Sequence, residues 1–200
     1  MKKTDLICKP PIPGVTRREF LCMAAAGLAL ALPVIAGAAE MRKKDQLSGT
    51  VTILEFSNDG KPKGAVQVAR IVKTEDEWRK QLPRESFEIT RHEGTERPYT
   101  GKYWNLHSKG IYRCICCDTP LFDSATKYDS GTGWPSYWKP IAEANIEKTN
   151  DYGLGIPRVA VSCKRCGAHL GHVFDDGPPP TGLRYCMNSG ALRFVGADAT

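Results

Sequence analysis

The apolar positions of this 200-residue chain fall into two regimes. Residues 23–36 form one continuous apolar stretch behind a short, basic and proline-interrupted start. From residue 51 onward, apolar residues come in short β-type runs separated by glycine, proline, asparagine and aspartate, and beyond Thr100 no helical periodicity is sustained. The pattern therefore predicts a mainly antiparallel β body, with helix confined to its N-terminal side.

Local signals place the first elements. The runs Val51–Phe56 and Ala65–Val72 predict a hairpin, because Asn58-Asp59-Gly60 between them can supply a turn. Residues 74–77, Thr-Glu-Asp-Glu, are a capping box that predicts a helix through about Leu82.

Pro83 should end that helix, and a second short helix or a turn is expected over Ser86–Thr90.

The first 38 residues are typical of an export signal that is removed. Arg17-Arg18 precedes the apolar stretch, which is shorter than the roughly 20 residues that span a bilayer. Ala36-Gly37-Ala38 then offers the small residues that a signal peptidase reads. The order resembles a twin-arginine signal and predicts periplasmic localisation, whereas a retained N-terminal anchor is the alternative.

Charge adds little once this segment is set aside. The whole chain has a formal net charge of +6, but five basic and two acidic residues precede residue 39, so the remainder carries about +3. A weakly basic body gives little support to nucleic-acid binding, and we expect none.

Spacing divides the eight cysteines. Cys8 and Cys22 fall within the predicted signal; two CxxC pairs follow, Cys114 with Cys117 and Cys163 with Cys166. A CxxC knuckle can direct two thiolates at one ion, so the two pairs predict a tetrahedral Cys₄ zinc site that pins two hairpins together. Disulfides are the alternative in an oxidising compartment, although twin-arginine export carries proteins that are already folded. A thioredoxin-type redox pair is poorly supported, because neither pair precedes a convincing helix.

Cys186 stands apart from both pairs. Arg184 and Asn188 would share its face in a strand, and a guanidinium favours the nucleophilic thiolate. His169 and His172 follow the second CxxC and can act as proton donors.

Each of these residues also has a plainer interpretation. Cys186 could be a buried structural cysteine and the two histidines could be zinc ligands. Trp134, in a glycine-flanked turn, could form a small apolar pocket or belong to the core.

Taken in order, five segments are similar to the peptide methionine-R-sulfoxide reductases of the B type. They are the first CxxC, SGTGWPSY, the second CxxC, GAHLGHVFDDGP and PTGLRYCMNSGAL, within about Lys73–Phe194. The resemblance implies an α+β, mainly β fold: two antiparallel sheets in a barrel-like core, peripheral N-terminal helices and a Cys₄ zinc distant from the active site. It divides the chain into the signal (1–38), a hairpin extension (39–72) and a reductase domain (73–196).

The resemblance also implies roles for the site residues. Cys186 would attack the sulfoxide sulfur and become a sulfenic acid. His169 or His172 would protonate the oxygen and Asp176 would steer a histidine. Asn188 and Arg184 would orient the site, and Trp134 would hold the ε-methyl group.

One departure concerns regeneration of the enzyme. Where relatives often carry a second, resolving cysteine, this chain has Thr132 and Thr100. We therefore expect an external thiol, from a thioredoxin-like reductant, to reduce Cys186 directly in a monomeric enzyme that repairs oxidised proteins. Cys116 has no role that the sequence supplies. The competing hypotheses are a zinc-ribbon binding module and a disulfide-stapled envelope protein.

Overall fold

The computed structural model describes residues 49–153 and 157–197, so the predicted signal over residues 1–38 lies outside the described residues. In chain order the elements are β1 (Thr50–Phe56), β2 (Pro62–Ala69), α2 (Glu75–Gln81), α3 (Arg84–His92), β3 (Gly110–Cys114), β4 (Pro120–Asp123), η1 (Ser124–Thr126), β5 (Lys127–Tyr128), β6 (Ser136–Tyr137), η2 (Glu143–Asn145), β7 (Ile146–Asp151), β8 (Arg158–Cys163), β9 (His169–Phe174), β10 (Arg184–Met187), η4 (Ser189–Ala191) and β11 (Leu192–Gly196). No helix in these ranges has the length and apolar character needed to cross a membrane.

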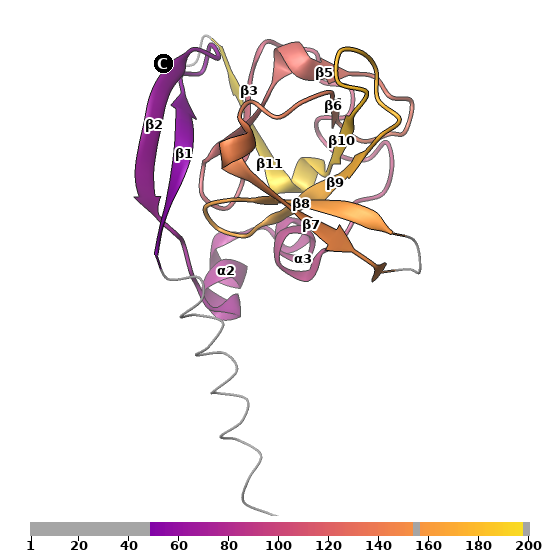
Figure 1. Ribbon diagram of the computed structural model, residues 1–200. Helices are drawn as coiled ribbons and strands as arrows, with labels where there is room; N and C mark the ends of the chain where they lie inside the picture. Colours follow the sequence, from indigo (N-terminus) through magenta and orange to yellow (C-terminus); the bar gives the residue numbers. More distant parts are fainter. Residues whose placement is uncertain (1–48, 154–156, 198–200) are drawn as a thin grey trace, which may run out of the picture. The chain divides into compact units, whose positions relative to one another are not determined.

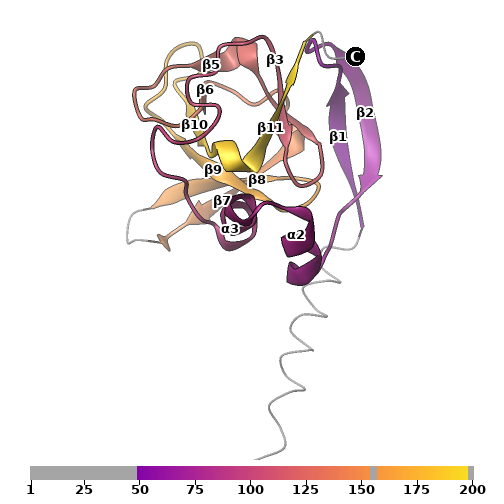
Figure 2. The ribbon, with the colours of Figure 1, turned by 180° about the vertical axis from the view of Figure 1, so that it is seen from behind.

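Antiparallel strands dominate the part of the chain that the structure describes. Six strands form one sheet in the order β5-β6-β10-β9-β8-β7, three form a second in the order β11-β3-β4, and β1 pairs with β2. The two helices lie side by side at one end of the strands (Figures 1 and 2). The predicted mainly β fold is confirmed, and its barrel-like closure stays a prediction.

The predicted hairpin forms from β1 and β2. Its turn is tight, because Ser57 N donates to Lys61 O at 2.9 Å and Gly60 N donates to Ser57 O at 3.0 Å. Gly60 has φ 82°, which glycine adopts at no steric cost. Since the turn closes at Lys61, the second strand covers residues 62–69 rather than the predicted 65–72.

Both predicted helices are present. In α2 the capping box is complete: Glu77 N donates to Thr74 Oγ1, and the Glu77 carboxylate accepts from Thr74 N. α3 covers Arg84–His92, more than the predicted 86–90. Its end residues are charged, so the apolar pattern that marks the buried middle of the helix does not extend to them.

An aromatic core joins the two larger sheets. Tyr112 of β3 and Phe122 of β4 meet Tyr137 of β6 and Tyr185 of β10, and all four are buried. Phe122 stacks on Tyr137 with ring centroids 4.4 Å apart, and Tyr112 meets Tyr137 edge-on at 5.2 Å. The core thereby fixes β6 and β10 against the smaller sheet.

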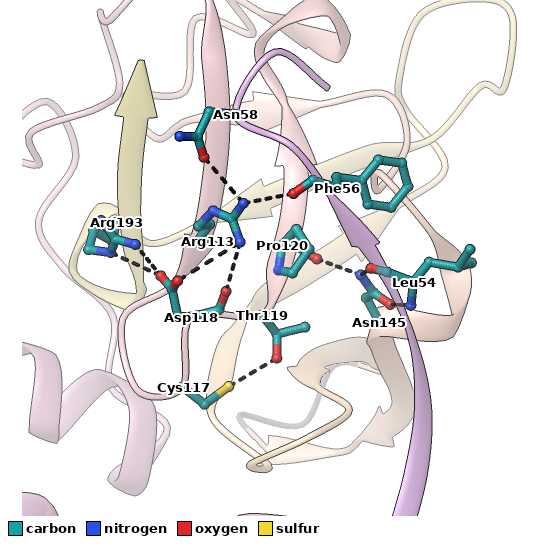
Figure 3. Close-up of polar contacts among 10 residues, drawn as sticks. All are labelled: Leu54, Phe56, Asn58, Arg113, Cys117, Asp118, Thr119, Pro120, Asn145 and Arg193. Carbon is teal, nitrogen blue, oxygen red and sulfur yellow. Dashed lines mark hydrogen bonds and ion pairs between the residues drawn. The ribbon is translucent and has the colours of Figure 1, made fainter. Parts of the chain in front are cut away.

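Two buried polar side chains attach the hairpin to this body (Figure 3). Asn145 is fully buried; its Oδ1 accepts from Leu54 N at 2.7 Å, and its Nδ2 donates to Leu54 O and Pro120 O, both at 2.8 Å. Arg113 Nη2 donates to Phe56 O at 2.9 Å. One amide therefore satisfies three backbone groups from β1 and β4, and the hairpin is part of the folded body.

We predict that Asn145→Ala destabilises the protein by about 3 kcal/mol, because three buried backbone groups lose their partner. Urea denaturation followed by circular dichroism measures this. Asn150→Ala, at an exposed position of β7, is the control and should cost less than about 0.5 kcal/mol. Equal midpoints for the two variants would contradict the anchoring role.

Candidate active site and metal centre

β10 presents Cys186 on the outer face of the six-stranded sheet. Burial alternates along the strand, so Tyr185 and Met187 point into the core while Arg184 and Cys186 are only partly buried. Arg184 and Cys186 thus share a face, as predicted. The buried tyrosine next to Cys186 sets the direction in which the thiol points.

The pairing register places polar groups beside Cys186 on both sides. Cys186 is directly opposite His172 of β9 and Ser136 of β6, and Ser136 is opposite Tyr128 of β5. Directly paired residues share a sheet face. A row of a phenol, a hydroxyl, a thiol and an imidazole therefore crosses the sheet.

A bulge brings the second histidine to the same place. Residues three apart in a regular strand face opposite ways, but the β8–β9 register shifts between Val161 and Ser162, giving β9 one extra residue. As a result the rings of His169 and His172 meet with centroids 5.2 Å apart. Gly171 lies between them, and a Cβ there would fall 2.1 Å from Cys186 O.

The two imidazoles have different surroundings. His172 Nε2 is 2.8 Å from Asp151 Oδ2, which also accepts from Arg158 Nη2 at 2.6 Å. His169 is 6% exposed, its Nε2 has no hydrogen-bond partner among the described residues, and burial lowers its pKa to about 4. At neutral pH His169 is therefore uncharged, whereas the His172 ring is held by a carboxylate.

Asp176 does not occupy the place expected of it. Its two carboxylate oxygens accept from Nε and Nη2 of Arg184, each at 2.8 Å. The carboxylate that contacts a histidine belongs to Asp151 instead. Asp176 lies just beyond β9 and faces the neighbouring strand β10, so it reaches the guanidinium and fixes its orientation.

The Cys186 thiol responds to opposing effects. Burial raises its pKa, and the Arg184 charge together with a hydrogen bond from Thr132 acts in the opposite direction. The predicted influence of Arg184 is present, but burial outweighs it. Thr132 belongs to a hydroxyl chain: its Oγ1 is 2.8 Å from Ser130 Oγ, which is 2.7 Å from Ser136 Oγ.

Trp134 precedes β6, and Asn188 is buried just past the end of β10, so neither lies in the strands that form this row. The Trp134 indole is only partly buried, so it is not simply a core residue. Its Nε1 donates to Glu96 O at 3.1 Å, and Asn188 Oδ1 accepts from Glu96 N at 3.1 Å. One residue of the segment after α3 therefore contacts both.

The two CxxC pairs converge into one cluster. The Sγ atoms of Cys114, Cys117, Cys163 and Cys166 all lie within 4.8 Å of one another. Each knuckle closes in the same way: Asp118 N donates to Cys114 O, and Gly167 N donates to Cys163 O. Asp118 and Gly167, the residues that directly follow the two CxxC pairs, both have φ near 65°.

The sulfur spacing fits a metal ion and is longer than a disulfide bond. Sγ of Cys114 is 3.7 Å from that of Cys166, and Cys117 Sγ is 3.5 Å from Cys163 Sγ. Tetrahedral zinc with Zn–S bonds of about 2.3 Å separates its ligands by about 3.8 Å, whereas a disulfide bond is about 2.05 Å. The six described cysteines are free. Since Cys114 ends β3 and Cys163 ends β8, an ion here would join the two sheets.

Cys116 is buried beside the cluster but outside the group of four. Its carbonyl accepts from Gln81 Nε2 at 2.8 Å, and Cys166 O accepts from Arg91 Nη1 at 3.1 Å. The two helices thus attach to both knuckles through backbone oxygens, and no contact brings Cys116 to Cys186.

Three residues of the site were not predicted from the sequence. Asp151 and Ser136 reach the site only through strand pairing, and Glu96 lies in a segment with no regular structure. Period-two alternation could have suggested Ser136 once β6 was recognised. Nothing local marks the other two.

Comparison with known proteins gives a consistent identity. Residues 82–196, more than half of the chain, match the SelR domain. A peptide methionine sulfoxide reductase MsrB from Herminiimonas arsenicoxydans is 53% identical over 131 residues, which cover 66% of this chain and 93% of that protein. Another MsrB, from Pseudomonas putida (strain W619), is 55% identical over 129 residues, which cover 64% of this chain and 97% of that protein. The chain therefore belongs to the SelR-domain family of MsrB-type peptide methionine sulfoxide reductases.

Proposed function

We propose that the chain reduces the R epimer of methionine sulfoxide in peptides and proteins, and so repairs oxidised proteins, with Cys186 as the nucleophile. Family membership supports methionine sulfoxide reduction. The observation that carries the residue assignment is the row in which Cys186 stands between Ser136 and His172. Among the described cysteines, Cys186 alone lies outside the two CxxC segments.

The chemistry follows from this arrangement. The Cys186 thiolate attacks the sulfoxide sulfur while the sulfoxide oxygen takes up a proton. The oxygen then passes to Cys186 as its bond to the methionine sulfur and the new bond between the two sulfurs both break, so methionine sulfur is reduced by two electrons and Cys186 is oxidised to a sulfenic acid. His172, held by Asp151, is the better proton donor, because His169 is neutral near pH 7 and can only donate a neutral hydrogen bond.

The remaining site residues orient the reactants. Arg184, clamped by Asp176, places a positive charge near the thiolate, and Trp134 offers an indole face to the ε-methyl group. Asn188 holds the end of β10 through Leu170 O, which accepts from its Nδ2 at 3.1 Å.

Replacing the nucleophile gives the decisive test. Cys186→Ser should lower reduction of the R epimer by about 1,000-fold or more, because a serine hydroxyl cannot take its place as nucleophile. Activity is measured on the separated epimers, with Cys116→Ala as the control that keeps Cys186. Full activity of Cys186→Ser, or equal turnover of the S epimer by the wild type, would sink the assignment.

We further propose a one-cysteine cycle. Thr132 lies beside Cys186, at the position where relatives often carry a resolving cysteine. Cys116 is held in the first CxxC segment, where its carbonyl accepts from Gln81. The sulfenic acid is then reduced by an external thiol, supplied by a thioredoxin-like partner.

Stoichiometric substrate without reductant should leave Cys186 as a sulfenic acid, because no other cysteine among the described residues contacts Cys186. Mass spectrometry after dimedone trapping detects one modified cysteine. A Cys186–Cys116 disulfide as the main product is the result that would contradict this cycle.

The four clustered cysteines are proposed to hold one structural zinc ion. When bound, zinc supplies a tetrahedral crosslink between thiolates and takes no part in the reaction. Cys114 and Cys117 contribute the β3–β4 turn, and Cys163 and Cys166 the β8–β9 turn.

Removal of the metal should destabilise the fold by on the order of 5 kcal/mol or more, because the two sheets lose their crosslink. Elemental analysis should give one zinc per wild-type chain and none in Cys163→Ser, with a lower unfolding temperature for the variant. Wild-type protein without bound zinc, or a variant of unchanged stability, would refute a structural zinc.

Location and partners complete the proposal. The twin-arginine pattern and the small residues up to Ala38 support export to the periplasm, with membrane contact only during transport. We propose that the exported chain is a monomer. A zinc-ribbon binding module would not explain why polar side chains gather around Cys186. The free cysteines disfavour a disulfide-stapled protein.

A further inference from the structure

A buried carboxylate lies directly behind the site. Glu96 is 5% exposed, and its oxygens accept from two backbone amides, Ser189 N at 2.7 Å and Gly190 N at 2.9 Å. These amides begin η4, immediately after Asn188 and the strand that carries Cys186. The carboxylate therefore ties the segment after α3 to the end of the catalytic strand.

The backbone of the same residue holds two site residues. Glu96 N donates to Asn188 Oδ1, and Glu96 O accepts from Trp134 Nε1. The Asn188 amide is fixed at both ends, since its Nδ2 donates to Leu170 O. Moving the Glu96 backbone would thus shift the indole and free one side of the amide.

The segment around Gly101 closes one side of the carboxylate. A Cβ built on Gly101 would lie 2.3 Å from Glu96 Oε1 and 2.3 Å from Ser189 Oγ. The Ser189 hydroxyl in turn accepts from Tyr103 N at 3.2 Å. The segment around Gly101 therefore packs directly on the Glu96–Ser189 contact.

We infer that Glu96 is a positioning residue for the substrate pocket: its carboxylate anchors the backbone that orients Trp134 and Asn188. The inference rests on the proposed function of those two residues. Glu96 itself contacts none of the reacting groups. It acts through Trp134, which precedes β6, and Asn188, which follows β10.

Glu96→Gln tests the charge and both acceptor atoms with little change in size. A carboxamide accepts through one atom only and turns its N–H groups toward the second backbone amide. We expect kcat/KM for the R sulfoxide to fall by about 100-fold, with a rise in KM, because the methyl pocket is displaced. Gly101→Ala, which pushes on the intact carboxylate, should lower kcat/KM in the same way. Glu85→Gln, on an exposed position of α3, is the matched control and should match the wild type.

A second measurement does not depend on activity. The indole N–H signal of Trp134, assigned in ¹H–¹⁵N spectra by its loss in Trp134→Phe, should shift and exchange faster with solvent in Glu96→Gln. Thermal unfolding of each variant checks that it is folded. If Glu96→Gln does not fold, the kinetics of Gly101→Ala test the positioning role of Glu96.

The outcomes separate the two proposals. Wild-type kinetics in a folded Glu96→Gln, with or without a shifted indole signal, would overturn the positioning role. If the wild type reduces neither epimer, the proposed function fails, and an unchanged indole signal would then also overturn the link between Glu96 and Trp134.

Discussion

Because side chains alternate along a strand, the pairing of β10 with β9 determines two things at once. It sends Tyr185 and Met187 into the core, and it sets Cys186 opposite His172 on the other face. A slip of one residue would bury the thiol and expose the tyrosine. The packing of Tyr185 therefore protects the register that the proposed chemistry needs, and the core and the site are stabilised by the same contacts.

Buried polar side chains fix the positions of segments outside the six-stranded sheet. Asn145 satisfies backbone groups of β1 and β4, and Glu96 satisfies those of η4. Both are expensive to bury unless every hydrogen bond is made, so each permits only one arrangement of the chains it joins. The hairpin, which precedes the SelR match, is attached to the body in this way.

The Cys₄ cluster and the aromatic core connect the same two sheets. Cys114 and Cys163 end strands of different sheets, and Tyr112 and Tyr137 meet between those sheets. The aromatic contact is non-directional burial, whereas a metal would fix geometry at the turns. Together they leave the two sheets little freedom to move apart.

The sequence by itself determined the features that depend on near neighbours. The capping box at Thr74, the β1–β2 turn and both CxxC knuckles were predictable, because each is formed by residues a few positions apart. Motifs around Cys186 identified the family for the same reason. Only the tertiary structure decided that Asp151, not Asp176, contacts His172, that a bulge brings His169 beside it, and that Glu96 reaches Asn188. Those contacts join residues that are distant in sequence or out of phase in a strand, so pairing and packing of the whole chain set them and local pattern does not.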